Sequence, residues 1–285
     1  FALLQPRSST MAKEVNRRVL IGGLLVAHVA GGILASLRSA DEPAVSTCIL
    51  FGLAFCQVTL LGIWSGLGAT HWVLRLIGTA CGIAAVYFAL AWGIKYHGGD
   101  FFLLLLLPAL LSSAICIALR LVGIKLSDES TKAQHEREGL RFTIRHLMIW
   151  TFVVACLVTL GKNLDFEFES ARTAIIIATL GTSYAGVGVS TMWAVLGQGN
   201  LALLCAIAAV IAVVAGFVNA HMVGDNAPDQ TLFWIAIIVI QSLLLLASLG
   251  VIRAAGYRLV RKAARSNGGK NSNSIKETTS PFESL

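Results

Sequence analysis

Long apolar runs, each close to the length needed to cross a lipid bilayer, recur along the whole chain and constrain its fold more than any other feature. A helix that crosses about 30 Å of hydrocarbon needs about 20 apolar residues, because each residue adds about 1.5 Å. Barrel strands would instead alternate apolar and polar residues over about ten positions, a pattern that is absent here. The runs therefore predict an all-α integral membrane protein, a polytopic bundle of about eight transmembrane helices. The predicted spans are residues 19–37, 44–66, 76–94, 101–119, 147–161, 173–197, 201–220 and 232–252.

The composition excludes several other classes of protein. The chain is 56% hydrophobic and 13% charged, whereas soluble domains are about 45–50% apolar and about 25% charged. This balance excludes a soluble enzyme, a disordered chain and a disulfide scaffold. The net charge of +7 does not indicate nucleic-acid binding, because the Lys and Arg residues flank apolar runs instead of forming a stripe on a soluble domain. The implied partner is the lipid bilayer, and no cofactor is implied.

Lys and Arg residues divide unevenly between the two sides of the predicted spans. The two tails and the connections on their side of an eight-span chain hold 18 of the 22 basic residues. Cytoplasmic segments of membrane proteins are enriched in Lys and Arg, so this division places both termini in the cytoplasm. Seven spans would separate the two basic termini, which the same rule disfavours.

The predicted spans divide the chain into two halves of four helices each. An even number of spans per half gives both halves the same orientation, so a repeat would be parallel and not inverted. No residue-level match between the halves supports such a repeat, and we expect symmetry of topology only. We also expect the eighth helix to continue from Arg253 to Arg265 before the tail becomes disordered. The regions are a cytoplasmic N-terminal segment (1–18), a first membrane half (19–119), a cytoplasmic loop with a short amphipathic helix (120–146), a second membrane half (147–252) and a basic, partly disordered cytoplasmic tail (253–285).

The N-terminal residues carry two expectations. Met11-Ala-Lys-Glu resembles a translation start, so residues 1–10 are expected to be an upstream artefact or a fragment end. The first apolar run lacks a convincing small-residue cleavage site before Asp41, which favours a retained helix over a signal peptide.

The residues before the fifth predicted span form a recognisable pattern. Arg141-Phe-Thr-Ile-Arg145-His-Leu-Met leads directly into this span. It resembles the F-[ST]-[IL]-R-x-L-[LM] segment that precedes a membrane span in uncharacterised planctomycete-type bacterial multi-pass membrane proteins, over about residues 141–161. The resemblance implies a bacterial inner membrane and supplies no catalytic residue. Arg141 and Arg145 share one helical face, where they are expected to anchor the segment at anionic headgroups of the cytoplasmic leaflet.

Four polar but uncharged residues are candidates for a functional role inside the membrane. They are His28, Gln57, Asn219 and Gln241. One interpretation is that they line a path for a substrate or an ion. The other, which we favour, is that they form hydrogen bonds between helices. Pro108 is expected to kink the fourth span.

Small residues recur at every fourth position on several predicted helices. This pattern lets helix backbones approach closely, so we expect contact faces there and not ligand sites. The run on the sixth span, Ala178/Thr182/Gly186/Ser190/Ala194, is long enough to predict a tight contact face. The glycines that we expect to serve helix packing are Gly78, Gly82, Gly186 and Gly216.

Three functions are compatible with the sequence. We favour a non-catalytic scaffold, assembly partner or sensor, because no Asp, Glu, Lys or Arg lies in the centre of a predicted span. The alternative is a small-molecule transporter or channel with an uncharged pathway. The weakest is a membrane enzyme that holds a metal with His97, His221 and nearby carboxylates, whose spacing matches no motif. No catalytic, cofactor-binding or metal-binding residue is therefore predicted.

Overall fold

The computed structural model describes residues 7–38, 43–68, 70–94, 99–128, 171–197, 200–223 and 228–261. Within these ranges it contains seven helices and one two-stranded sheet. Six of the helices are long and apolar enough to cross a membrane, which confirms a polytopic helical membrane protein. The elements are α1 (Arg7–Arg38), α2 (Pro43–Leu67), α3 (Trp72–Ile94), α4 (Gly99–Leu121), β1 (Ile124–Asp128), α6 (Ala171–Leu196), α7 (Leu201–Val223), α8 (Pro228–Ala254) and β2 (Tyr257–Arg261).

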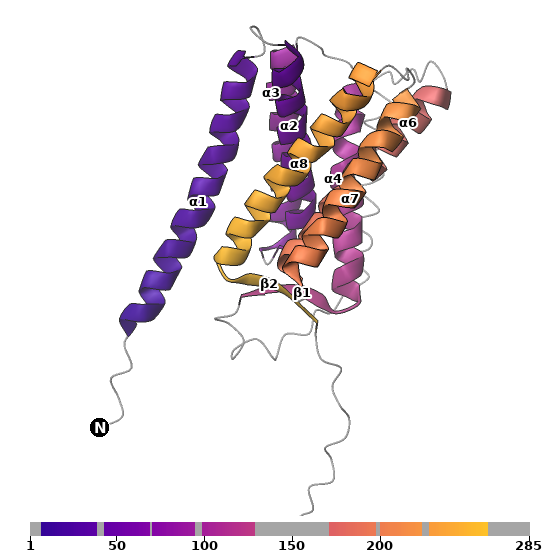
Figure 1. The fold of residues 1–285 in the computed structure, drawn as a ribbon. Coiled ribbons are helices and arrows are strands. Elements are labelled where there is room, and N and C mark those ends of the chain that lie inside the picture. Colours follow the sequence, from indigo (N-terminus) through magenta and orange to yellow (C-terminus); the bar gives the residue numbers. More distant parts are fainter. Residues whose placement is uncertain are drawn as a thin grey trace, which may run out of the picture.

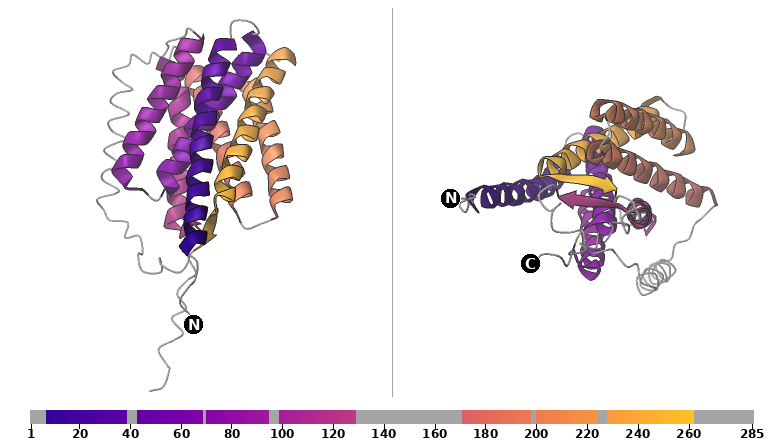
Figure 2. Two further views of the ribbon diagram at one scale, coloured as in Figure 1. Left: turned by 90° about the vertical axis from the view of Figure 1, so that its left-hand side faces the viewer. Right: turned by 90° about the horizontal axis from the view of Figure 1, so that it is seen from below.

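The helices lie side by side as one bundle, and the sheet crosses one end of it (Figure 1, Figure 2). Strand β1 follows α4 and β2 follows α8, so both helices end at the sheet. Helix α6 also ends there, because Arg253 near the end of α8 donates a hydrogen bond to the carbonyl of Val195 near the end of α6. Helices α4, α6 and α8 are therefore parallel to one another.

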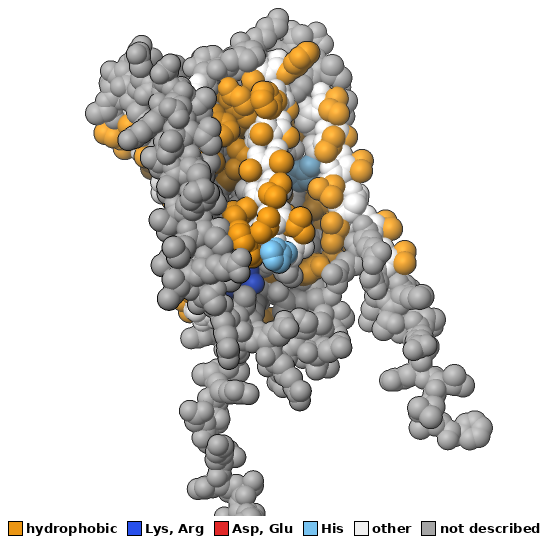
Figure 3. All heavy atoms as spheres, turned by 180° about the vertical axis from the view of Figure 1, so that it is seen from behind, with side chains coloured by type: hydrophobic (Ala, Val, Ile, Leu, Met, Phe, Trp, Pro, Cys, Tyr) orange, Lys and Arg blue, Asp and Glu red, His pale blue; other side chains and the backbone are white. Residues whose placement is uncertain are grey.

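The basic residues gather at the sheet end of the bundle. Of the twelve Lys and Arg residues that the structure describes, Arg38 and Arg172 lie at the opposite end, and the other ten lie in the first part of α1, in the strands, or at helix ends near the sheet. Figure 3 shows a face on which the coloured side chains are almost all apolar, as contact with lipid requires.

Helix α2 is the centre of the bundle. It packs against α1, α3, α4, α6 and α8. Its closest neighbour is α4, where a Cβ atom on Gly62 would lie 2.5 Å from the carbonyl oxygen of Ala109. One turn later, a Cβ atom on Gly66 would collide with Cys116. Gly62 and Gly66 thus form a G-x-x-x-G contact between α2 and α4, which the sequence interpretation missed.

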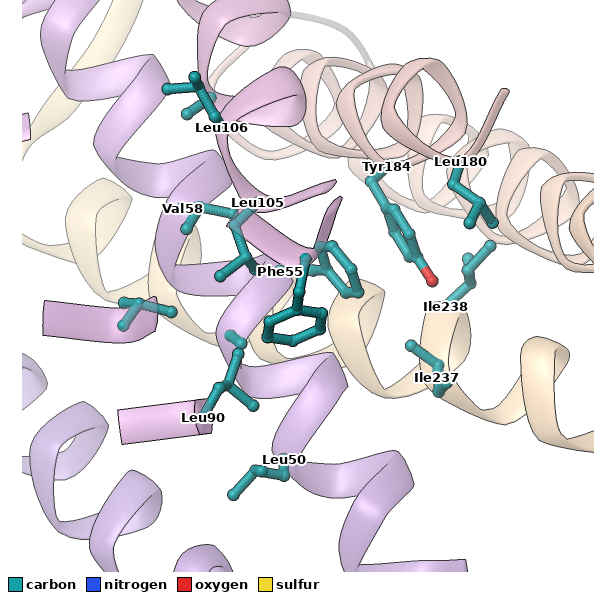
Figure 4. Packing of buried hydrophobic residues seen from close by; sticks show 14 of the residues in the cluster. Leu50, Phe55, Val58, Leu90, Leu105, Leu106, Leu180, Tyr184, Ile237 and Ile238 are labelled. Atoms are coloured by element: carbon teal, nitrogen blue, oxygen red, sulfur yellow. The ribbon is translucent and has the colours of Figure 1, made fainter. Parts of the chain in front are cut away.

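The core beside α2 is aromatic. Phe55 of α2 and Tyr184 of α6 are both 0% exposed, and their ring centroids are 3.7 Å apart in a stacked arrangement. Leu105 of α4 and Ile238 of α8 are also 0% exposed and belong to the same cluster (Figure 4). Burying such side chains contributes roughly 25 cal/mol per Å² when helices pack in water, and in lipid the close packing itself takes over this role.

The sheet corrects the expectation for the C-terminal tail. Helix α8 ends at Ala254, and Gly256 has a positive φ of 94° that ends the helix and turns the chain into β2. Gly123 does the same after α4, with a φ of 91°. Residues with a side chain rarely adopt this backbone conformation, whereas glycine adopts it readily. The predicted continuation of the eighth helix through residue 265 was therefore wrong.

The two halves share residues at equivalent helix ends, which the sequence interpretation had not recognised. Helices α2 and α6 both end in Trp-x-x-Leu-Gly, at 64–68 and 193–197. In both, the glycine N–H donates to the tryptophan carbonyl, at 2.8 Å and 2.9 Å. Helices α4 and α8 both end in Arg-x-x-Gly-x-[Lys/Arg]-Leu, at 120–126 and 253–259.

Contacts between the halves follow the same correspondence. Aligning the two Trp-x-x-Leu-Gly motifs assigns each residue of α2 a counterpart on α6, and aligning the two Arg-x-x-Gly motifs does the same for α4 and α8. Phe55 stacks on its own counterpart, Tyr184. Gly52 and Gly181 are counterparts, as are Leu107 and Ile240. A Cβ atom on Gly52 would lie 2.6 Å from Ile240, and one on Gly181 would lie 2.5 Å from Leu107.

The strand register completes this symmetry. Strands β1 and β2 are antiparallel, with Leu126 opposite its counterpart Leu259, while Ile124 lies opposite Arg261 and Asp128 opposite Tyr257. If each residue is replaced by its counterpart in the other half, the pair Ile124–Arg261 becomes the pair Tyr257–Asp128. The strand pairing is therefore the same when the two halves are interchanged. The described helices α2–α4 and α6–α8 are thus parallel repeats, related by an approximate two-fold axis along the bundle. Helix α1 has no counterpart among the described residues, and the fifth predicted span, 147–161, lies outside them.

Two further boundaries differ from expectation. The third helix begins at Trp72, so Arg75 lies in its first turn and not in a connection. Residues 124–128 of the predicted 120–146 loop form β1, and the predicted amphipathic helix lies outside the described residues.

Candidate functional site

His28 and Gln57 lie together, at the contact of α1 with α2 and α8. Gln57 Nε2 donates to the carbonyl of His28 at 3.2 Å, and His28 Nε2 lies 2.8 Å from the hydroxyl of Ser248. Ser248 donates its one hydroxyl hydrogen to the carbonyl of Leu244 at 2.7 Å. His28 Nε2 is therefore the donor to Ser248, which leaves Nδ1 as a bare acceptor. This buried Nδ1 has no partner among the described residues.

Gln241 lies on α8, seven residues before Ser248 and so on the same face of the helix. It is 0% exposed. Its Nε2 group lies 3.4 Å from Thr59 Oγ1 and 3.4 Å from the carbonyl of Tyr184, so it joins α8 to α2 and α6. In the described part of the chain, Gln241 Oε1 and the Tyr184 hydroxyl are buried without a hydrogen-bond partner.

Asn219 is separate from both groups. It is 0% exposed and lies on α7, on the face that also buries Ala208, Ala212, Gly216 and Ala220. Neither polar atom of its amide has a partner among the described residues. The structure therefore brings together His28 with Gln57, and leaves Gln241 and Asn219 in two other places.

The glycines that were expected to serve packing differ in their surroundings. A Cβ atom on Gly78 would lie 2.9 Å from Trp64, one on Gly82 would lie 2.6 Å from Leu61, and one on Gly216 would lie 2.9 Å from the Cα atom of Ile235. A Cβ atom on Gly186 would have no atom within 4 Å.

The small-residue face of α6 is mostly exposed. Ala178, Thr182 and Gly186 are exposed, Ser190 is half-buried, and only Ala194 is buried. No described helix covers most of this run, so the tight contact face stays a prediction. The pattern identifies a smooth surface, but it does not say whether another helix covers it.

Most residues of the metal hypothesis lie outside the described ranges, and the structure does not bring together those that it describes. His97 lies outside the described residues, while His221 and Asp229 are exposed. Across the described ranges, no group of three His, Cys, Asp or Glu side chains could hold a metal ion. The interfacial anchors Arg141 and Arg145 also lie outside these ranges.

Three arginines at the sheet end form contacts that the sequence interpretation did not identify. Arg75 Nη1 donates to the carbonyl of Ser65 at 2.8 Å. Arg75 and Arg120 both reach the carbonyl of Gly66, at 3.4 Å each. Arg253, the counterpart of Arg120, donates to Val195, the counterpart of Gly66. The last carbonyls of a helix have no partner within that helix, so these guanidinium groups cap the ends of α2 and α6.

The arrangement can thus join helices and cap their ends. Compared with known proteins, the chain matches no family model, no curated sequence and no solved structure. The functional argument therefore depends on the geometry of the chain itself.

Proposed function

We propose that this chain is a non-catalytic multi-pass protein of a bacterial inner membrane, which acts as a scaffold, an assembly partner or a sensor. One observation carries the proposal: three of the four polar candidates within the membrane, His28, Gln57 and Gln241, form contacts between helices. His28 and Gln57 hold α1 to α8 and α2, and Gln241 holds α8 to α2 and α6. Such hydrogen bonds stabilise a membrane bundle by about 0.6 kcal/mol each.

The contact between the two repeats supports the same proposal. Phe55 and Tyr184 stack with no exposed surface, and Gly188 is in close contact with Thr59 beside them. Parallel repeats in transporters hold their substrates near the middle of the membrane, at the boundary between the repeats. Here that boundary is filled by side chains.

We further propose eight spans with both termini in the cytoplasm. Helices α4 and α6 are parallel, so the chain has to return to the other end of the bundle between them. The predicted span 147–161 would supply this crossing. This span is the expected counterpart of α1. Helix α1 contacts Leu53 and Gln57 of α2, and their counterparts on α6 are the exposed Thr182 and Gly186. The concentration of basic residues at the sheet end supports a cytoplasmic location for that end.

The alternative function is that of a small-molecule transporter or channel with an uncharged intramembrane pathway. It is favoured by two buried polar atoms without partners among the described residues at the boundary between the repeats: Gln241 Oε1 and the Tyr184 hydroxyl. Buried polar groups are almost always hydrogen-bonded, so such atoms can indicate a bound water or ligand.

Solute flux separates the two functions. The purified protein would be placed in vesicles, and the rate of swelling in urea, glycerol and erythritol would be followed by light scattering. We expect the rates of protein-free vesicles. Faster swelling that is abolished by Gln241→Leu would overturn the scaffold proposal in favour of transport.

A further inference from the structure

The sheet end of α2 carries two arginine side chains where the equivalent end of α6 carries one. Arg120 and Arg253 are counterparts in the two repeats, and each caps the helix beside it. The counterpart of Arg75 is Leu204, which has no charge. Since one guanidinium group is sufficient to cap α6, capping does not account for the second one at α2.

The two guanidinium groups at α2 lie close together. Both Nη1 atoms are 3.4 Å from the same oxygen, the carbonyl of Gly66, so they are separated by no more than two hydrogen-bond lengths. Like charges at this distance repel one another. Neither Arg75 nor Arg120 forms an ion pair with a carboxylate among the residues that the structure describes.

The hydrogen bonds of both arginines to described residues leave several of their donor groups unused. Each guanidinium has five N–H donors, yet the hydrogen bonds to α2 use Nη1 alone. The Nε atom of Arg75 is buried and has no acceptor in the described structure. An anion with several oxygens, held between two guanidinium groups, would accept these hydrogens and neutralise the repulsion.

The position of the pair suits a ligand at the membrane surface. Both side chains lie at the end of the bundle where basic residues gather, and each is only half-buried. Trp64, whose side chain is 37% exposed, lies in the last turn of α2 beside them. Tryptophan prefers the headgroup level of a bilayer, and basic pockets between transmembrane helices bind phosphate headgroups.

We propose that Arg75 and Arg120, at the end of α2, bind a phosphate-bearing anion. The phosphate can belong to an anionic lipid headgroup or be free in solution, and the two sources share the same chemistry. The site is a property of the first repeat alone, because Leu204 replaces Arg75 in the second.

The test uses the full chain in an uncharged detergent. Dioctanoyl-phosphatidylglycerol, dioctanoyl-phosphatidylcholine and inorganic phosphate would each be titrated, and bound ligand would be counted by native mass spectrometry. We expect saturable binding of one phosphatidylglycerol, and no saturable binding of the zwitterionic lipid. Equivalent binding of inorganic phosphate would identify free phosphate as a ligand and would support the same site.

The variants separate the anion site from helix capping. Arg75→Leu copies the second repeat, so it should keep the α2 cap through Arg120 while weakening phosphatidylglycerol binding at least tenfold. Arg253→Gln is the matched control: it removes a cap and should lower the melting temperature without changing anion binding. Arg120→Gln and Arg75→Lys provide independent variants if Arg75→Leu does not fold, and Arg75→Lys should retain partial binding because the charge remains. Wild-type affinity in both Arg75→Leu and Arg120→Gln, or an equal loss in Arg253→Gln, would overturn the proposal.

Discussion

Replacing Gly62 with alanine tests the close contact between α2 and α4 that centres the bundle. The added Cβ atom would lie 2.5 Å from the carbonyl oxygen of Ala109 and 3.0 Å from the Cβ atom of Ser112. The nearest atom belongs to backbone, so it cannot move aside by changing a rotamer. The two helices must separate, and overpacking of this kind costs about 1–3 kcal/mol.

A gain in helix propensity opposes this cost. Alanine is more favourable than glycine in a helix by up to about 1 kcal/mol, so Gly62→Ala should destabilise the protein by about 1–2 kcal/mol. Gly250→Ala in α8 is the matched control, because its Cβ atom would have no neighbour within 4 Å. That variant should be neutral or stabilised by up to about 1 kcal/mol.

The free energies of unfolding would be measured in mixed micelles by titration with SDS, with helix content followed by circular dichroism. We expect the midpoint for Gly62→Ala to fall below that of the wild type, and the midpoint for Gly250→Ala to equal or exceed it. Equal midpoints for the two variants would refute the close approach of α2 and α4.

Three other predictions address the polar residues, the topology and the sheet. Gln241→Leu should change the free energy of unfolding by less than about 1 kcal/mol, because it removes two long hydrogen bonds together with the buried, unpaired Oε1 atom. SDS titration would measure this change, and a loss of stability above about 3 kcal/mol would contradict the prediction. A membrane-impermeant maleimide added outside intact cells should label Asp229→Cys and not Leu201→Cys, since these exposed residues lie at opposite ends of the bundle. The reverse labelling pattern would show that the proposed topology is inverted. Gly256→Ala should lower stability by about 1–2 kcal/mol, because a side chain is strained at a φ of 94°; an unchanged melting temperature would count against β2 as described.

The bundle was predictable because it depends on properties that each segment carries alone. Apolar length and flanking charge define a span without reference to its neighbours, so the six helices confirmed by the structure were found within a few residues of their ends. The sheet was not predicted, because five-residue basic strands such as Tyr257–Arg261 look like a helix continuation until Gly256 is recognised as its end.

The repeat was present in the sequence and was missed. Trp64 and Trp193, and Gly123 and Gly256, occupy matching positions in short motifs that are spread over two long, otherwise different halves. The contacts of the candidate residues depend instead on which helices lie next to one another. Which helix lies opposite Gly186 or Gln241 is a property of the assembled bundle, and a small-residue pattern is the same on a buried face and on an exposed one.

The claim that intramembrane polar residues join helices is tested most directly by a double-mutant cycle between His28 and Ser248, whose side chains are 2.8 Å apart. The free energies of unfolding of wild type, His28→Ala, Ser248→Ala and the double variant would be compared in the same micelles. We expect a favourable coupling energy of about 0.6 kcal/mol, and up to about 1.7 kcal/mol. A coupling energy of zero would contradict the claim.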